Sequence, residues 1–300
     1  MMTSTERIAV IGAGRLGAAL SKALARLPHF RVSSIIDKDI QRAANCARQV
    51  NASHFSDTIS ELKSVDLIFV AVSDDAIPLV ADDLVTLARG TKIAHFVFHT
   101  SGALSMDVFN GLRPFDIEIG SLHPIQTFAG RSDEAAKLQH IYFGIEGTEK
   151  GIARLIEMVT ALNSNYLVIP ADEKPLYHAA CLFASNYVVA LMKPVVAIFN
   201  HLGFDEMESQ SIVYPLALNT LENMKENGLG AALTGPLSRG DIGTITRHIQ
   251  LIKKHFPEYE AAYKELGRIA LKFKSVQTAL PAEVFRQIRQ LLSDKDEDDD

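Results

Sequence analysis

The sequence predicts an α/β protein in which a doubly wound parallel sheet is followed by an entirely helical region. Short apolar runs rich in β-branched residues alternate with amphipathic helical patterns as far as about residue 170. The runs are apolar at nearly every position, which is typical of parallel strands covered by helices on both faces. From residue 171 onward the apolar side chains recur almost throughout with helical spacing.

Strands are expected, in chain order, at residues 7–12, 31–37, 66–72, 92–100, 117–124, 140–147 and 165–170. Helical patterns lie between several of them, at residues 15–27, 39–50 and 148–162. We therefore expect a first domain over residues 1–170, a helical domain for substrate binding and dimerisation over 171–292, and an acidic tail over 293–300. The tail carries the like-charged block DKDEDDD and is expected to be disordered.

The composition narrows the possible classes of function. The chain has 300 residues, 47% hydrophobic and 22% charged, which is enough for two domains with cores. Its net charge is -6 and it has no stripe of Lys and Arg, so no nucleic-acid partner is expected. Cys46 and Cys181 lie in apolar periodic segments, which predict buried inert thiols rather than a disulfide framework or a metal site.

The first residues, MMTSTER, run directly into a predicted strand and lack the features of a secretory signal. We identify no apolar run as long as the roughly 20 residues of a membrane-spanning helix. The expectation is a cytoplasmic protein that has a small-molecule substrate and no membrane partner.

Three glycines follow the first predicted strand in the pattern GAGRLG. This pattern alone also fits an ordinary glycine turn, but here it follows a strand and opens a helix. In that context the first glycine permits a tight turn, the second lets the backbone approach a pyrophosphate, and the third lets helix and strand pack closely. We therefore predict that a dinucleotide binds to Gly12, Gly14, Arg15, Leu16 and Gly17.

An acidic residue follows at the end of the second predicted strand. Asp37 lies about 20 residues beyond Gly17, where a carboxylate accepts hydrogen bonds from the hydroxyls of an adenosine ribose. This position favours NAD. Lys38 and Arg42 lie close enough to meet a 2′-phosphate, so NADP is the alternative.

Ser73 and Asp74 follow the predicted strand at residues 66–72. They therefore lie at the carboxyl edge of the sheet, where ligands of open α/β folds bind, and we predict that they contact the cofactor. The alternative is a plain cap on a helix that begins near Ala76.

Two histidines end predicted strands, in FHTSG and in SLHP. His123 is the preferred general acid or base, because imidazole titrates near neutral pH and Pro124 restricts the chain just after it. His99 is more typical of a core residue. Ser101 is predicted to assist the chemistry through its hydroxyl, or else to form a plain turn with Gly102.

The helical half contains YHAACLFASNY, which places His178, Ser185 and Asn186 at positions i, i+7 and i+8 on one face of a predicted helix. Polar groups on an apolar face need partners. We predict that His178 and Asn186 contact the substrate, with hydrogen bonds between helices as the alternative. Arg239 is expected to bind a substrate carboxylate or to form a surface ion pair.

With GAGRLG, FHTSG, SLHP and HAACLFASN, the chain resembles the 6-phosphogluconate-dehydrogenase-like superfamily, in which a Rossmann domain precedes an all-helical domain and the active site lies between them. Within it, the chain is most similar to the oxidoreductase family that joins a Rossmann-like domain to a helical domain of unknown function. Prephenate dehydrogenase is a relative whose HP motif carries the catalytic histidine, assisted by a serine. That resemblance implies these roles for His123 and Ser101. It also implies that the protein uses NAD, because Asp37 matches the residue behind that enzyme's preference for NAD.

The resemblance has departures. The histidine-rich SHLPH helix of prephenate dehydrogenase is replaced here by FASNY. β-Hydroxyacid dehydrogenases carry a catalytic Lys and Asn four residues apart, and in this chain Lys174 and His178 have that spacing while Asn186 lies farther on. The substrate of this chain therefore cannot be inferred from either relative.

The sequence thus predicts an NAD(P)-dependent dehydrogenase or reductase of a small, carboxylate-bearing hydroxy or oxo compound. Its predicted catalytic residues are His123, Ser101, His178 and Asn186, without a metal. An imine reductase resembling pyrroline-5-carboxylate reductase and a non-catalytic dinucleotide sensor are the alternatives. A homodimer is expected because the long apolar helices have more nonpolar surface than one small domain covers.

Overall fold

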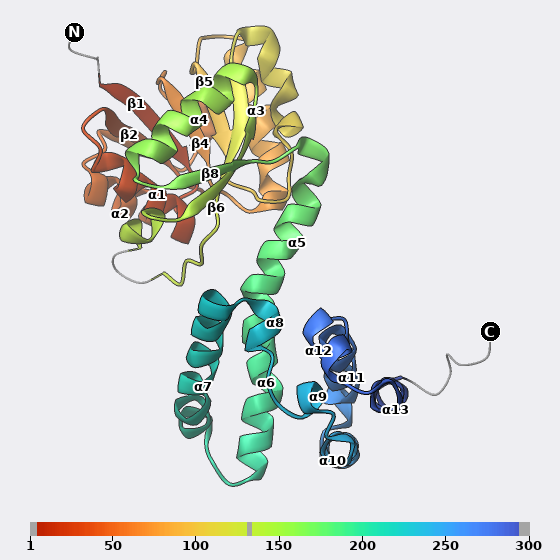
Figure 1. Ribbon diagram of the computed structural model, residues 1–300. Coiled ribbons are helices and arrows are strands. Elements are labelled where there is room, and N and C mark those ends of the chain that lie inside the picture. The colour runs from red at the N-terminus through yellow and green to blue at the C-terminus, as the bar shows by residue number, and fades with distance from the viewer. Residues whose placement is uncertain (1–4, 131–133, 294–300) are drawn as a thin grey trace. The chain divides into compact units, whose positions relative to one another are not determined.

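The computed structural model describes residues 5–130 and 134–293, and in them the predicted α/β architecture is confirmed (Figure 1). The predicted acidic tail lies, after residue 293, outside the described residues. The chain divides into two compact units, Met1–Val188 and Val189–Asp300. The predicted domain boundary at residue 170 falls just before helix α5 (Lys174–Ala184), which is grouped with the first unit.

The first unit contains one sheet, with the order β3-β2-β1-β4-β5-β6-β7-β8 in the described part of the chain. Neighbouring strands are parallel except β6 and β7, which are antiparallel. All seven predicted strands are present, and the unpredicted β3 has three residues, too few for a recognisable pattern. The strands are β1 (Glu6–Ile11), β2 (Phe30–Ile36), β3 (His54–Ser56), β4 (Leu67–Val70), β5 (Phe96–His99), β6 (Glu118–Pro124), β7 (Tyr142–Gly147) and β8 (Asn165–Val168).

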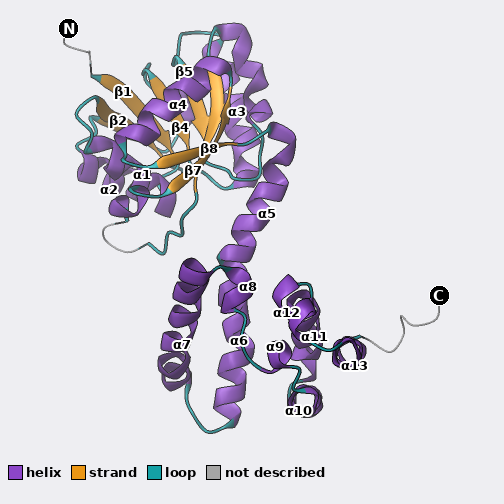
Figure 2. Ribbon diagram, viewed as in Figure 1, coloured by secondary structure: helices purple, strands orange, loops and turns teal. Residues whose placement is uncertain are grey.

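Helices cover both faces of this sheet, as Figure 2 shows for its purple helices and orange strands. One face packs against α1 (Arg15–Ala25), α2 (Ile40–Val50) and α4 (Glu149–Ala161). The other face packs against α3 (Ile77–Ala88) and the 3-10 segment η3 (Met106–Phe115). This two-sided burial explains why the strands are apolar at nearly every position.

The rest of the chain is helical, as predicted, and has its own small core. That core contains Ile245, Leu271, Val276, Ile288 and Leu292, all nearly inaccessible to solvent. The helices are α6 (Asn186–His201), α7 (Glu206–Asn227), α8 (Leu229–Ala232), α9 (Pro236–Arg239), α10 (Ile242–His255), α11 (Glu260–Leu271), α12 (Lys274–Ala279) and α13 (Ala282–Leu292).

The prediction of one helix face carrying His178, Ser185 and Asn186 is wrong. Helix α5 ends at Ala184 and α6 begins at Asn186, while Ser185 between them has φ -127° and ψ -75°. The Ser185 hydroxyl donates to the carbonyl oxygen of Cys181 at 2.7 Å. The spacing i to i+8 therefore does not place His178 and Asn186 on a common face.

The helical stretch at residues 171–201 is long and apolar enough to cross a membrane by length and composition alone, and no residue of its apolar window is buried. The expectation that the chain has no run of this length is therefore wrong: residues 175–192, between Lys174 and Lys193, contain no Asp, Glu, Lys or Arg. The same composition also suits a helix that is covered by another apolar protein surface.

Candidate active site

The glycine loop joins β1 to α1, and its shape requires glycine at two positions. Gly12 has φ +101°, and a Cβ there would lie 2.5 Å from the carbonyl oxygen of Ala71. A Cβ on Gly17 would collide with the carbonyl oxygen of Gly12. At Gly14, by contrast, nothing lies within 4 Å of the position that a Cβ would take. The loop is therefore closed on the protein side and open beside Gly14, where a phosphate group would approach.

Helix α1 begins at this loop with free backbone donors. Gly14 occupies its N-cap, no side chain caps the helix, and its first turn contains no acidic residue. The unpaired N–H groups and the positive end of the helix dipole are therefore available to an anion. Arg15 is exposed and Leu16 is half-buried at the same turn.

A cleft of about 540 Å³ lies next to the glycine loop. Polar and glycine residues line it from the ends of β1 and β2, the start of α2, the segments after β3 and β4, and α3. They are Gly12, Gly14, Asp37, Lys38, Arg42, Asp57, Ser73 and Asp83. The predicted cofactor residues Gly12, Gly14, Asp37 and Ser73 are thus brought together at the carboxyl edge of the sheet.

The Asp37 carboxylate is held at this cleft by backbone N–H groups. One oxygen accepts from Ala13 at 2.6 Å and the other from Asp39 at 2.9 Å. Arg42 also lines the cleft, but its guanidinium is paired with Asp39 at 3.1 Å. The acid is therefore fixed, whereas a 2′-phosphate would compete with Asp39 for Arg42.

Ser73 and Asp74 are both exposed at the start of the 3-10 turn η2 (Asp74–Ala76). No side-chain hydrogen bond caps this turn, so the capping alternative is not seen. Ser73 lines the cleft, whereas Asp74 is not among the residues that do.

His99, at the end of β5, is fully buried and both of its ring nitrogens are occupied. The backbone N–H of Ser101 donates to Nδ1 at 3.2 Å, so the ring proton is on Nε2 and is shared with the carbonyl oxygen of Ser105 at 3.3 Å. Burial, with a contribution from Lys174, lowers the pKa of His99 to about 3. His99 is therefore a neutral structural residue.

Ser101 forms a turn. This is the alternative that the sequence left open beside a role of its hydroxyl in the chemistry. Its hydroxyl oxygen accepts from the N–H groups of Ala103 and Leu104 at 3.1 and 3.0 Å, and the residue is buried. No hydrogen bond joins Ser101 to His123 among the described residues. The catalytic role that the resemblance implies for Ser101 remains a prediction.

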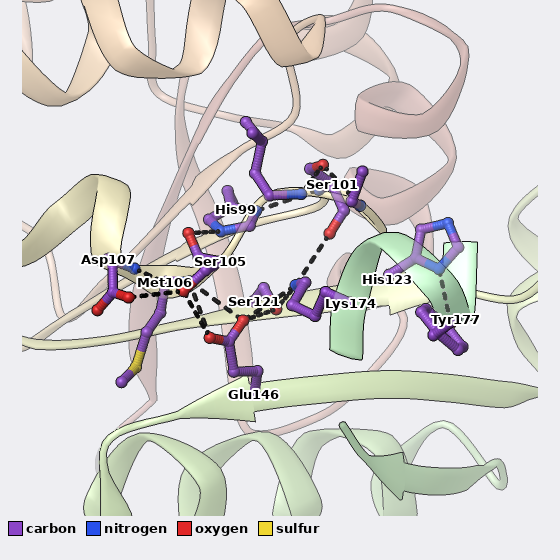
Figure 3. Close-up of polar contacts among 12 residues, drawn as sticks. His99, Ser101, Ser105, Met106, Asp107, Ser121, His123, Glu146, Lys174 and Tyr177 are labelled. Carbon is purple, nitrogen blue, oxygen red and sulfur yellow. Dashed lines mark hydrogen bonds and ion pairs between the residues drawn. The ribbon is translucent and has the colours of Figure 1, made fainter. Parts of the chain in front are cut away.

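His123 lies near the end of β6 and is only half-buried. Its Nδ1 is 2.7 Å from the hydroxyl oxygen of Tyr177 on α5, and the two rings meet edge to face (Figure 3). Burial, together with the neighbouring His178 and Lys174, lowers the pKa of His123 to about 4. The ring is therefore neutral at pH 7.

His178 and His123 both pack on Gly102. Their ring centroids are 5.7 Å apart. A Cβ on Gly102 would lie 2.7 Å from Cδ2 of His178 and 2.9 Å from Nε2 of His123. The fold thus brings together two of the predicted catalytic residues, with the free nitrogen of His123 directed at a glycine backbone.

Asn186 is not part of this group. It is exposed, and its side-chain oxygen lies 2.9 Å from the hydroxyl oxygen of Ser185. Arg239, considered for a substrate carboxylate, forms a two-nitrogen fork on Asp241 at 2.8 and 3.0 Å. In this conformation Arg239 therefore forms a surface ion pair, the second of the two interactions expected for it.

A buried ion pair that the sequence pattern did not predict lies beneath the histidines (Figure 3). Lys174 is 2% exposed, and its ammonium lies 3.1 Å from the Glu146 carboxylate. It also donates to the hydroxyl of Ser121 and to the carbonyl oxygen of Ser101. All three ammonium protons therefore have acceptors.

Glu146, on β7, extends this cluster to the loop after β5. Its carboxylate accepts from the Ser105 hydroxyl at 2.9 Å and from the Met106 backbone N–H at 3.1 Å. The spacing of Lys174 and His178 in the sequence was a sign that Lys174 belongs to the site. No pattern in the sequence indicated Glu146, because only the antiparallel pairing of β7 with β6 brings it next to Lys174.

Comparisons with known proteins agree with this architecture. A Rossmann-like domain matches residues 2–124, and a domain of unknown function, DUF2520, matches residues 141–270. The predicted combination of a Rossmann-like domain with a helical domain of unknown function is therefore confirmed. No curated protein matches the chain.

Several solved structures share the fold over nearly the whole chain. A Bacteroides fragilis protein, BF3122, named as a candidate NADP oxidoreductase, has 24% identity and a TM-score of 0.72, over 88% of this chain and 97% of that one. Protein TM1727 from Thermotoga maritima has 26% identity and a TM-score of 0.70, over 90% and 98%. An imine reductase from Myxococcus stipitatus has 18% identity and a TM-score of 0.62, over 94% and 99%.

Proposed function

We propose that this chain, in which a Rossmann-like domain precedes a DUF2520 domain, is a nicotinamide-dinucleotide-dependent oxidoreductase. The observation that carries the proposal is the pairing of two features at one edge of the sheet: the open glycine loop with its cleft and Asp37, and the half-buried His123 beside Gly102. Ligands of open parallel sheets bind at this edge. Oxidoreductases among the proteins that share the fold support the same class.

The dinucleotide, when bound, supplies the hydride chemistry. The residues present fit it, because the loop is open only beside Gly14 and the α1 N-terminus has no anionic cap of its own. Gly12, Gly14, Arg15, Leu16 and Gly17 would hold the pyrophosphate, while Asp37 and Ser73 would hold the adenosine side, with Asp74 next to them. We favour NAD because the Asp37 carboxylate is fixed at the cleft. NADP is the alternative, and it is the dinucleotide named for BF3122.

We propose His123 as the general acid or base, with His178 orienting the substrate across Gly102. Ser101 would act through the backbone of its turn, and Asn186 would contribute only after the substrate is bound. The substrate class we favour is a small hydroxy or oxo compound with a carboxylate. A cyclic imine is the second candidate, which the likeness to an imine reductase favours.

We also propose that the protein is a cytoplasmic homodimer. Large apolar side chains are exposed along α6 and α7, among them Val189 at 73%, Met207 at 79% and Leu216 at 68%. A second copy of the chain is the partner that would cover them, because apolar patches of this kind are seldom left in water. Light scattering after size-exclusion chromatography tests this, and a monomeric mass would contradict it.

The cofactor proposal is tested by titrating the protein with NADH and with NADPH and following nicotinamide fluorescence. Asp37→Ala should weaken NADH binding about 10-fold or more, the loss expected for charged hydrogen bonds to the ribose, and should narrow the preference for NADH over NADPH. Asp82→Asn, which removes an exposed carboxylate on α3 that does not line the cleft, is the control. No binding of either dinucleotide to the intact protein would refute the proposal.

The reaction is tested by incubating the protein and NADH or NADPH with a panel of 2-oxo acids, hydroxy acids and cyclic imines, and following the nicotinamide absorbance. Turnover of an oxo or hydroxy acid supports the favoured class, and turnover of imines alone supports the second. Bound dinucleotide with no turnover of any compound would favour a sensor.

A further inference from the structure

We infer that Tyr177 is a positioning residue that fixes the proton of His123 on Nε2, so that the resting site presents a hydrogen-bond donor to its substrate. The inference rests on the proposed function and deepens it. A fixed N–H suits a carbonyl oxygen or an imine nitrogen, whereas an alcohol that is to be oxidised needs a base.

The first support is the contact itself. The Tyr177 hydroxyl oxygen lies 2.7 Å from Nδ1 of His123, and the rings are nearly perpendicular, at 89°. Gly144 lies opposite His123 in the β6–β7 ladder, and a Cβ on Gly144 would collide with the Tyr177 hydroxyl oxygen. The missing side chain at Gly144 therefore makes the space in which the phenol meets the imidazole.

The second support is the way α5 is attached to the strand that carries His123. Lys174 precedes Tyr177 by three residues, so both lie on the same side of the helix. The ammonium of Lys174 donates to Ser121 on β6, two residues before His123, and pairs with Glu146 on β7. This buried pair fixes the first turn of α5, and with it the phenol, against the two strands.

The third support is the choice of donor. Burial raises the pKa of Tyr177, so the phenol keeps its proton, while the lowered pKa of His123 keeps the ring neutral. A neutral imidazole has one N–H and one lone pair. A phenol is a much stronger acid than a neutral imidazole N–H, so the phenol donates and Nδ1 accepts. The ring proton is then on Nε2.

The position of Nε2 indicates which substrate atoms could accept this proton in a hydrogen bond. Nε2 faces Gly102, and the ring of His178 packs against the same glycine. A carbonyl oxygen or imine nitrogen that binds beside Gly102 would accept the Nε2 hydrogen. To act as a base instead, the ring would have to move its proton to Nδ1, and the hydrogen bond with Tyr177 would have to reverse its direction. The resting arrangement therefore favours substrates that are reduced.

The test measures the tautomer directly in the full-length protein. Ring-¹⁵N-labelled histidine is incorporated, and two-bond ¹H–¹⁵N spectra are recorded at neutral pH, with His123→Asn used to assign the His123 signals. We expect a single tautomer with Nε2 protonated in the unaltered protein. In Tyr177→Phe we expect that single pattern to be lost and the protonation midpoint of His123 to rise, because the phenol no longer stabilises the neutral ring.

The matched control is Tyr263→Phe, which removes the hydroxyl that lies 3.0 Å from Nδ1 of His248 in the helical unit. It should leave the His123 signals unchanged. Gly144→Ala is the second test variant, because it keeps Tyr177 but fills the space of its hydroxyl, and it should reproduce the effect of Tyr177→Phe. Circular dichroism and the melting temperature confirm that each variant is folded.

An Nδ1-protonated His123 in the unaltered protein would overturn the inference, and so would a tautomer pattern that is the same in folded Tyr177→Phe. NADH and NADPH are titrated into the same samples. A Tyr177-dependent Nε2–H tautomer in a protein that binds neither dinucleotide would refute the proposed function but not the assignment of Tyr177. If the protein binds a dinucleotide but His123 is protonated on Nδ1, the assignment of Tyr177 is refuted and the proposed function is not.

Discussion

Two histidines at neighbouring strand ends, His99 on β5 and His123 on β6, have opposite hydrogen-bond situations. His99 is fully buried, and the loop after it occupies both ring nitrogens, through Ser101 and Ser105. His123 is half-buried and has one nitrogen on Tyr177, while the other faces Gly102. The same residue type at the same edge of the sheet thus serves the fold in one case and is available for chemistry in the other.

The difference lies in the segment that comes after each strand. The chain after His99 turns back tightly and supplies its own N–H and carbonyl groups to the ring. Two residues after His123, the position that serves His99, the N–H of Ile125 instead donates to the carbonyl oxygen of Tyr142, and the partner of the His123 ring comes from α5. A strand-end histidine is thus structural where its own loop satisfies both nitrogens. Substitutions at the two histidines and at the ion pair beneath them test this distinction.

The largest effect is expected for His123→Asn. Turnover on the true substrate should fall by roughly 100- to 10,000-fold, as is typical for the loss of a general acid or base, while dinucleotide affinity is unchanged. Nicotinamide absorbance and fluorescence measure the two quantities. His29→Asn, at an exposed histidine of the same unit, is the control. Turnover equal to that of the unaltered protein would remove His123 from the mechanism.

The next effect is expected for Glu146→Gln, because the Lys174–Glu146 pair supports both histidines. Glu146 holds Ser105 and Met106 beside His99, and Lys174 holds the start of α5 beside His123. Leaving the buried Lys174 charge unpaired should lower the free energy of unfolding by about 3–5 kcal/mol, as measured by urea denaturation.

The double variant Glu146→Gln with Lys174→Met is the matched control for this prediction. It removes both charges and should recover part of the loss. A single variant as stable as the unaltered protein would show that the ion pair is not needed for the fold.

A smaller effect is expected for His99→Leu. The buried Ser101 N–H and Ser105 carbonyl lose their partner, which should cost about 2–3 kcal/mol of the free energy of unfolding. Turnover per folded molecule should fall much less than in His123→Asn. A loss of turnover as large as that of His123→Asn, without a loss of stability, would reverse the roles assigned to the two residues.

The smallest effect is expected on mild acidification. The pKa of His99 is about 3 in the folded protein and about 6.5 when unfolded, so between these values the unfolded chain binds more protons. Stability from this residue is complete above pH 6.5 and decreases as the pH falls, by up to about 1.4 kcal/mol per pH unit. Urea unfolding at pH 7 and pH 5 measures it, and His99→Leu should show a flatter dependence.

Much of the fold and half of the site were predictable from local patterns. The strand runs, the helical spacing and GAGRLG each describe neighbours in the chain. The two-sided burial agrees with them, and so do the positions of Gly12, Asp37 and His123 at strand ends. The break at Ser185 was not predictable, because Ser, Asn and Tyr are all tolerated in helices and no glycine or proline marks this position.

The sequence by itself therefore determined the α/β class, the glycine loop and which residue types stand at the strand ends. Only the tertiary structure decided what each strand-end side chain touches. The antiparallel return of β7 carries Glu146 to Lys174, and the missing side chain of Gly144 admits Tyr177 to His123. These contacts join residues far apart in the chain, and no local pattern encodes them, because they depend on which strands become neighbours.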